Sequence, residues 1–184
     1  MCLLQQLKYD DIKHFFKTNV HGHNGEFIFG YINDIPILCA NGRFHYYEGY
    51  SFQETGILQQ IFNHYNPKIS LITNSSGCLR LDWNIGDFMI SNKIIDYSYI
   101  KSSFPISYKT KQNNLIISSE LINYIHYGTY TYTIGPTYET LEEIKDIQRI
   151  GGDAVGMSTF SEFLMCEQLN MNYTIISCLT NYGA

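Results

Sequence analysis

The sequence predicts an α/β fold with a mostly parallel or mixed central sheet, and three observations lead to that class. Apolar residues repeat at helical spacing over residues 52–65 and again over residues 140–150. Short runs rich in β-forming residues stand between and after them, notably residues 69–73 and 173–179. Strands that alternate with helices are typical of α/β folds. The chain has 184 residues, enough for one sizeable core, so we expect a single domain over residues 1–184.

The first half of the chain supplies a hairpin, a helix and a strand. Residues 26–41 form two β-rich runs around Asn33 and Asp34, which predicts a hairpin. Asn66-Pro67 ends the helical pattern of residues 52–65. The uniformly apolar run 69–73 predicts a strand that is buried on both faces.

The second half of the chain also alternates between predicted strands and predicted helices. Residues 85–90 predict a turn that leads into a strand, and the polar, aperiodic stretch 92–114 predicts a long loop. Acidic residues at the start of the pattern 140–150 suit the positive end of a helix. The remaining segments, in order, are residues 115–127 (helix or strand), 129–134 (strand), 154–157 (short strand), 162–169 (helix) and 173–179 (strand).

Composition excludes several classes of protein. Twelve basic and 17 acidic residues give a formal charge of -5, so there is no sequence-wide basic field and we expect no nucleic-acid partner. No apolar run is long enough to span a membrane, and residues 1–9 do not resemble a secretory signal. The five cysteines are odd in number and far apart, which does not suggest a disulfide framework. We therefore expect a cytoplasmic protein that does not contact membranes.

Polar residues cluster just after the predicted strands, where α/β folds gather their functional groups. Arginine, histidine and serine offer donors suited to a phosphate, glutamate and asparagine suit the edge of a base, and tyrosine suits the face of a ring. The segments that carry these groups are residues 41–50, 74–77, 135–140, 156–159 and 180–181.

Six motifs in these segments occur in the same order as in a known family. They are VHGHNGEFIFG (residues 20–30), GRFHYYEGY (42–50), TNSSGCL (73–79), GPTYET (135–140), DAVGMST (153–159) and LTN (179–181). In these motifs the chain resembles the trimeric purine nucleoside phosphorylases, whose signature GRFHxYEGY is the most specific of the set. A single such motif would be weak, but six in order are specific.

The resemblance implies a fold and an activity. The fold is the phosphorylase/hydrolase-like three-layer arrangement, with a mixed central β-sheet flanked by helices, assembled as a homotrimer. The activity is phosphorolysis of 6-oxopurine (deoxy)ribonucleosides to the free purine and (deoxy)ribose 1-phosphate, as in purine salvage. Inorganic phosphate is the co-substrate, and neither an organic cofactor nor a metal is implied.

The resemblance also implies roles for individual residues. Glu139 accepts from N1–H of the base and Asn181 bonds N7 and O6; with His45 they form the catalytic set. The phosphate ligands are Arg43, His45, His23 and Ser158. The nucleoside-binding residues are Tyr47 and Met157 at the ribose, Tyr138 beside the base, Ser75, Glu139 and Asn181. The family's glycine-rich GSGLG phosphate loop, its later histidine and its closing helices have no counterpart in the 184 residues.

Four simpler interpretations stand beside these roles. Arg43 near Glu48 fits a surface ion pair, and an exposed guanidinium there contributes little to stability. His21 and His23 could ligate a metal together with His45 or Cys39, although the pair lacks the spacing of a known site. Ser158 fits an N-cap for the helix that follows. For the whole chain, the alternatives to a phosphorylase are an inactive purine-binding or oligomeric scaffold, and a nucleoside hydrolase.

Overall fold

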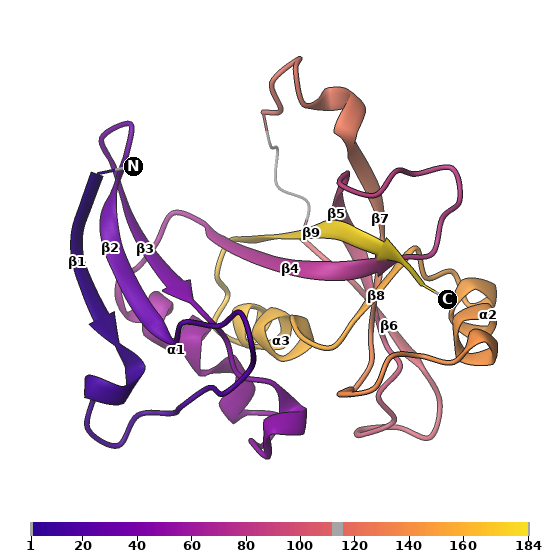
Figure 1. Ribbon diagram of the computed structural model, residues 1–184, viewed down its shortest axis with the longest axis horizontal. Helices are drawn as coiled ribbons and strands as arrows, with labels where there is room; N and C mark the ends of the chain where they lie inside the picture. The colour runs from indigo at the N-terminus through magenta and orange to yellow at the C-terminus, as the bar shows by residue number, and fades with distance from the viewer. Residues whose placement is uncertain (1, 112–115, 184) are drawn as a thin grey trace.

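A computed structural model describes residues 2–111 and 116–183, and it begins with a three-stranded antiparallel sheet (Figure 1). Its strands are β1 (Cys2–Lys8), β2 (Glu26–Ile32) and β3 (Ile35–Asn41). The turn between β2 and β3 lies at Asn33 and Asp34, whose φ angles are 47° and 63°. Positive φ at both central residues is what a tight two-residue hairpin requires, so the predicted hairpin is confirmed. Strand β1 was not predicted.

The second sheet has six strands in the order β6-β5-β7-β8-β4-β9. The bounds are β4 (Ser70–Cys78), β5 (Phe88–Asp96), β6 (Ile106–Lys109), β7 (Ile125–Tyr132), β8 (Ala154–Gly156) and β9 (Tyr173–Tyr182). Parallel pairing of β4 with β9 and of β7 with β5 and β8 combines with antiparallel pairing elsewhere, which confirms the mixed sheet. Strand β9 also pairs with β5, so the sheet closes on itself.

Helices flank this sheet, as predicted. Helix α1 (Ile57–His64) packs against α3 (Phe160–Gln168), whereas α2 (Leu141–Arg149) lies at the other end of the sheet (Figure 1). Helix α2 begins with a capping box, because the Thr140 hydroxyl accepts from the Glu143 amide and the Glu143 carboxylate accepts from the Thr140 amide. Within the described residues, no helix has the length and apolarity needed to cross a membrane.

Two apolar cores fix the loops that carry the site. The larger core lies between the closed sheet and α3 and includes Ile72, Tyr130 and Phe160. The smaller core is aromatic: Tyr9 and Phe44 pack with Leu58 of α1. Phe44 stands between two residues of the GRFH motif, so its burial anchors that loop next to α1 and the closed sheet.

Two expectations from the sequence are wrong. Residues 69–73 are not buried on both faces, because β4 alternates and leaves Leu71 56% exposed. The predicted loop over residues 92–114 contains most of β5 and all of β6, which pair with each other. The last three residues of the predicted loop (112–114) and the first residue of the ambiguous segment (115) lie outside the described residues.

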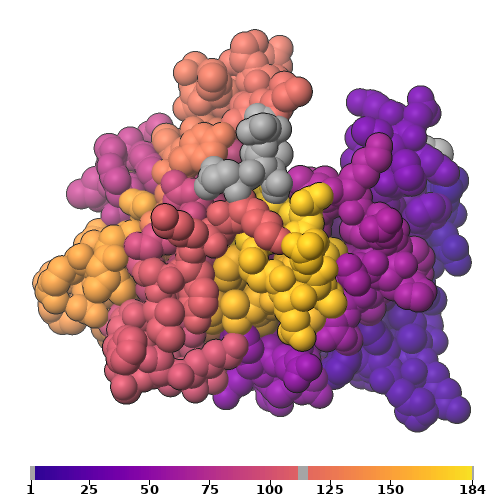
Figure 2. Space-filling model, turned by 180° about the vertical axis from the view of Figure 1, so that it is seen from behind, coloured from indigo at the N-terminus to yellow at the C-terminus, as the bar shows by residue number. Residues whose placement is uncertain are grey.

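Within the ambiguous segment 115–127, residues 116–124 form mainly a connection, since β7 begins only at Ile125. In the view from behind, this connection stands out from the surface, and the N-terminal sheet runs along one side of the molecule (Figure 2).

Candidate active site

Arg43 is the centre of the group that the sequence assigns to phosphate. It follows β3, and its Nη1 donates to the Thr73 carbonyl of β4 at 2.6 Å and to Ser158 Oγ at 3.3 Å. Its other edge meets the carboxylate of Glu162, with Nη2 donating to Oε1 at 3.2 Å and Nε lying 3.2 Å from Oε2. The Nε–H is not aligned with an acceptor, so that second contact is electrostatic rather than a hydrogen bond. Three segments far apart in the sequence therefore converge on one guanidinium.

The burial of Arg43 overturns both parts of the simpler interpretation of that residue. Its side chain is only 16% exposed and its ionic partner is the buried Glu162, not the neighbouring Glu48. Glu48 instead accepts from the His45 amide at 2.7 Å and contacts His45 Nδ1 at 3.1 Å. A surface ion pair and an exposed guanidinium are both wrong, because the loop packs against α3 and β4.

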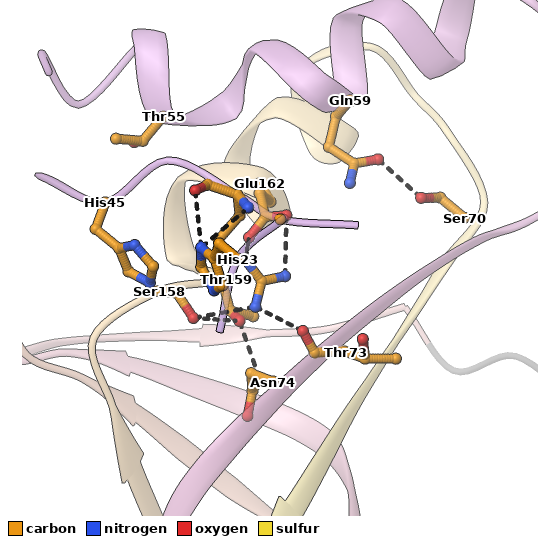
Figure 3. Close-up of polar contacts among 12 residues, drawn as sticks. His23, His45, Thr55, Gln59, Ser70, Thr73, Asn74, Ser158, Thr159 and Glu162 are labelled. Atoms are coloured by element: carbon orange, nitrogen blue, oxygen red, sulfur yellow. Dashed lines mark hydrogen bonds and ion pairs between the residues drawn. The ribbon is translucent and has the colours of Figure 1, made fainter. Parts of the chain in front are cut away.

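His23 and His45 stack beside Arg43. Their ring centroids are 5.1 Å apart, and Tyr47 stacks on the other side of His45 at 4.7 Å. His23 Nδ1 lies 3.2 Å from the Arg43 carbonyl oxygen and 3.4 Å from the Arg43 amide nitrogen. Figure 3 shows His23 and His45 on the same side of the group as Ser158. The structure thus brings together all four residues assigned to phosphate.

Burial lowers the pKa of both histidines below the ordinary value of 6.5, and the Arg43 charge lowers the two pKa values further. Both rings are therefore neutral at neutral pH. A neutral His45 whose Nδ1–H donates to Glu48 leaves Nε2 as an acceptor. That nitrogen suits the hydroxyl of a partly protonated phosphate or of a sugar.

Ser158 is held by a strained turn at the start of α3. Thr159 has a φ of 76°, which is unusual for a β-branched residue, and its hydroxyl accepts from Asn74 Nδ2 at 2.9 Å. Tyr130 Oη donates to the Ser158 carbonyl at 3.0 Å. The helix N-cap is Thr159 without a side-chain capping bond, so the interpretation of Ser158 as the N-cap is wrong.

The two residues assigned to ribose meet next to the histidines. A β-carbon added at Gly135 would lie 2.4 Å from Met157 Sδ and 3.0 Å from Tyr47 Cδ1. Only glycine fits between these side chains, and its φ of 71° also favours glycine. Because Tyr47 stacks on His45, the proposed ribose contacts adjoin the phosphate group directly.

The residues assigned to the base lie at the ends of neighbouring strands. Glu139 accepts from the Thr133 hydroxyl at 2.6 Å, and the Thr133 amide donates to the carbonyl of Gly156, the last residue of β8. Asn181 of β9 is in register with Gly77 of β4.

Strand β8 lies between the two residues assigned to the purine base, Glu139 and Asn181. Gly77 is in register with Val155, the residue before Gly156 in β8. Glu139 and Asn181 therefore lie on opposite sides of β8. Tyr138 is 83% exposed, and Ser75 and Asn181 are also exposed, so the structure does not pack these three side chains against the rest of the group.

The comparison with protein families identifies the family to which this chain is related. The family model of the phosphorylase superfamily matches residues 2–184. This chain belongs to that superfamily. The shared part therefore includes every element described above, from the N-terminal sheet to β9.

Individual relatives of this phosphorylase-superfamily member are purine nucleoside phosphorylases. Purine nucleoside phosphorylase 1 of Bacillus subtilis is 30% identical, over 97% of this chain and 72% of the relative. The Saccharomyces cerevisiae purine nucleoside phosphorylase is 31% identical, over 94% of this chain and 63% of the relative. The crystal structure of the Schistosoma mansoni enzyme in complex with acetate is 25% identical with a TM-score of 0.79, covering 98% of this chain and 74% of that one.

Sequence reasoning gave no role to three residues of this superfamily member's site: Glu162, Asn74 and Tyr130. Asn74 lies inside the TNSSGCL motif, so that motif was the available signal for it. Tyr130 and Glu162 carry no such mark, because each lies in an ordinary strand or helix pattern. No cluster of three or more possible metal ligands occurs among the residues that the structure describes.

Proposed function

We propose that this chain is a purine nucleoside phosphorylase, which cleaves purine (deoxy)ribonucleosides with inorganic phosphate. The observation that carries the proposal is the convergence of Arg43, Ser158, His23 and His45 beside Tyr47 and Met157. The relatives' shared activity supports it. The products are the free purine and (deoxy)ribose 1-phosphate.

The reaction makes opposite demands on the two sides of the sugar. As the C1′–N9 bond breaks, its electron pair moves onto the purine and C1′ becomes oxocarbenium-like, before a phosphate oxygen forms the new bond to C1′. Arg43 and Ser158 donate to the phosphate, while the acceptor Nε2 of His45 takes a hydrogen bond from a phosphate hydroxyl. These contacts hold the nucleophile in line with C1′ and reduce the entropic barrier to attack.

The purine must leave as an anion or collect a proton. Asn181 donates to N7, where negative charge develops, and Glu139 accepts from N1–H of a 6-oxopurine. A donor aimed at developing charge stabilises the transition state more than the ground state. This pair favours inosine and guanosine over adenosine, whose N1 has a lone pair instead of a hydrogen.

The proposal includes several further properties. Phosphate is a co-substrate, and the reaction uses neither a metal nor an organic cofactor. The protein acts in the cytoplasm as one domain, and three copies assemble into a homotrimer. Light scattering coupled to size-exclusion chromatography measures the assembly directly, and a monomer would contradict that part.

Inosine cleavage with and without phosphate tests the activity. Phosphate-dependent formation of hypoxanthine and ribose 1-phosphate, separated by chromatography, supports the proposal. Free ribose formed at the same rate without phosphate would identify a hydrolase instead. Binding of inosine without cleavage in either condition would identify a non-catalytic purine-binding protein.

A further inference from the structure

Glu162 is a buried carboxylate that none of the site assignments uses. It lies in the first turn of α3, its side chain is 5% exposed, and both of its oxygens face Arg43 at 3.2 Å. A carboxylate buried to this degree is expensive unless it is paired. Arg43 is its ionic partner, from a loop 119 residues earlier in the chain.

The contact fixes which edge of the guanidinium faces the site. Glu162 takes the edge formed by Nε and Nη2, which leaves Nη1 to contact Ser158 Oγ and the Thr73 carbonyl. A guanidinium is a planar fork, so holding one edge sets the direction of the remaining N–H groups. Figure 3 shows Glu162 above the polar group and Ser158 on its opposite side.

Charge alone does not explain why Glu162 is there. With both histidines neutral, the charged groups on the phosphate side of the site are Arg43, Glu162 and Glu48, which sum to one negative charge. A second carboxylate near the phosphate position weakens the attraction for an anion. The benefit that offsets this loss is geometric, because a fixed guanidinium does not have to be ordered when phosphate binds.

We propose that Glu162 is a positioning residue for phosphate: it holds Arg43 so that the guanidinium stays beside Ser158 Oγ, where a phosphate oxygen would take the N–H that Nη1 now gives to Ser158. The inference rests on the proposed phosphorylase function. It gives Glu162 no contact with substrate, since its oxygens are occupied by Arg43.

Orientation and charge make opposite predictions for Glu162→Gln. The glutamine amide has nearly the same shape as the glutamate carboxylate. Its NH2 group, however, is a donor that faces the N–H donors of the guanidinium, so Arg43 loses its fixed direction. We expect the KM for phosphate to rise about tenfold, since small displacements of a positioned group have effects of this order or larger. The KM for inosine should stay within about twofold, because its contacts come from other residues. If the carboxylate acted only through its charge, the phosphate KM would fall instead.

Glu167→Gln is the matched control. Glu167 lies on the same helix and loses the same charge, but its carboxylate accepts from the Tyr173 hydroxyl at 2.5 Å and does not face Arg43. Its phosphate KM should match that of the unmodified protein. Glu162→Asp serves if the glutamine variant does not fold: the charge remains but the carboxylate recedes by one methylene, and the phosphate KM should again rise.

A second readout separates this inference from the proposed function. The shift in Tm caused by inorganic phosphate reports binding without turnover. A shift in the unmodified protein that shrinks in Glu162→Gln, together with an absence of cleavage, overturns the phosphorylase function alone. A shift and phosphate KM that are unchanged or improved in folded Glu162→Gln and Glu162→Asp overturn the positioning role. No phosphate shift in the unmodified protein overturns both.

Discussion

The two sides of the proposed site are built in different ways. On the phosphate side, Arg43 and Glu162 are largely buried and hold each other in place before any substrate arrives. On the base side, Tyr138 is 83% exposed and Asn181 is exposed at the end of β9. The phosphate side is therefore tied to the stability of the protein. The base side is free to change without affecting the core.

This difference follows from where each side lies in the fold. Ser158 and Glu162 belong to the junction of β8 and α3, whose helix packs into the larger core. Asn181 occupies the last strand, and its side chain hydrogen-bonds to its sequence neighbours, donating to the Tyr182 carbonyl and accepting from Thr180. Substitutions on the phosphate side should therefore alter both folding and activity, whereas substitutions on the base side should alter selectivity alone.

Arg43→Ala should have the largest effect and is the strongest test of this comparison. It removes the guanidinium and should abolish phosphate-dependent cleavage. It also leaves Glu162 charged, buried and unpaired, which costs about 3–5 kcal/mol of stability. Urea unfolding and phosphate kinetics measure the two effects, and a variant as stable as the unmodified protein would show that the pair is not buried in solution.

The double variant Arg43→Ala/Glu162→Gln separates the two losses. Neutralising Glu162 removes the unpaired charge, so the double variant should be more stable than Arg43→Ala. It should remain inactive, because the phosphate ligand is still missing. Recovery of activity together with stability would mean that Arg43 serves only the fold.

Gly135→Ala should have the next largest effect, because Gly135 lies between the two sides of the site. The new methyl would displace Met157 and crowd Tyr47. We expect the KM for inosine to rise roughly tenfold and the phosphate KM to change less. Gly151→Ala is the matched control, since Gly151 has a φ of 92° but no atom within 4 Å of the added β-carbon. Both variants should lose about 1–2 kcal/mol from the positive φ. Equal inosine KM values in the two would show that Met157 and Tyr47 do not contact the ribose.

The arginine and serine of the phosphate side were easier to foresee than the carboxylate that holds the arginine. Motif order alone named Arg43 and Ser158, and the structure brings them within 3.3 Å. Motif order could not name Glu162, because its position in a short helix is compatible with an ordinary surface residue. Only tertiary packing brings Arg43 to it across 119 residues.

The same limit explains the wrong prediction over residues 92–114. Strand β5 contains polar residues such as Lys93 and Asp96, so its pattern has no strand period. It is a strand because β7, β6 and β9 all pair with it, and β9 comes about 80 residues later in the chain. By contrast, the hairpin at Asn33 and Asp34 and the acidic start of α2 depend on adjacent residues, and sequence alone predicted both.

Asn181→Asp should have a smaller effect, confined to base choice. A 6-oxopurine presents an acceptor at O6 and a hydrogen at N1, whereas adenine presents the reverse. Each buried mismatch costs about 1–3 kcal/mol, so inosine should be cleaved far better than adenosine by the unmodified protein. An aspartate can accept from the adenine amino group, and the ratio of kcat/KM values should shift toward adenosine by about tenfold.

The control for Asn181→Asp is Asn172→Asp, which makes the same charge change at an exposed site where the amide contacts the Lys68 carbonyl. Its selectivity should match that of the unmodified protein, and Asn181→Asp should leave the Tm nearly unchanged. Equal kcat/KM values for inosine and adenosine in the unmodified protein would contradict the base-side assignment.

The smallest expected effect is a dependence of stability on pH that originates on the phosphate side. Burial lowers the folded-state pKa of His23 and His45 below 6.5, so the unfolded chain binds more protons near that pH. Stability therefore rises with pH, and it falls as the pH drops from 7 to 6. For one histidine the loss over this interval is less than about 1 kcal/mol. The carboxylates with lowered pKa, such as Glu26 and Asp87, act in the same direction but only nearer their own ordinary range.

Urea unfolding at pH 7 and pH 6 measures this slope. His45→Asn removes one of the two groups and should flatten the slope, although it also weakens the contact with Glu48. His64→Asn is the matched control, because it makes the same histidine-to-asparagine change at an exposed position of α1. A slope that is the same in all three proteins would mean that the His45 ring is open to solvent. The phosphate side would then be as exposed as the base side, and the contrast between the two would disappear.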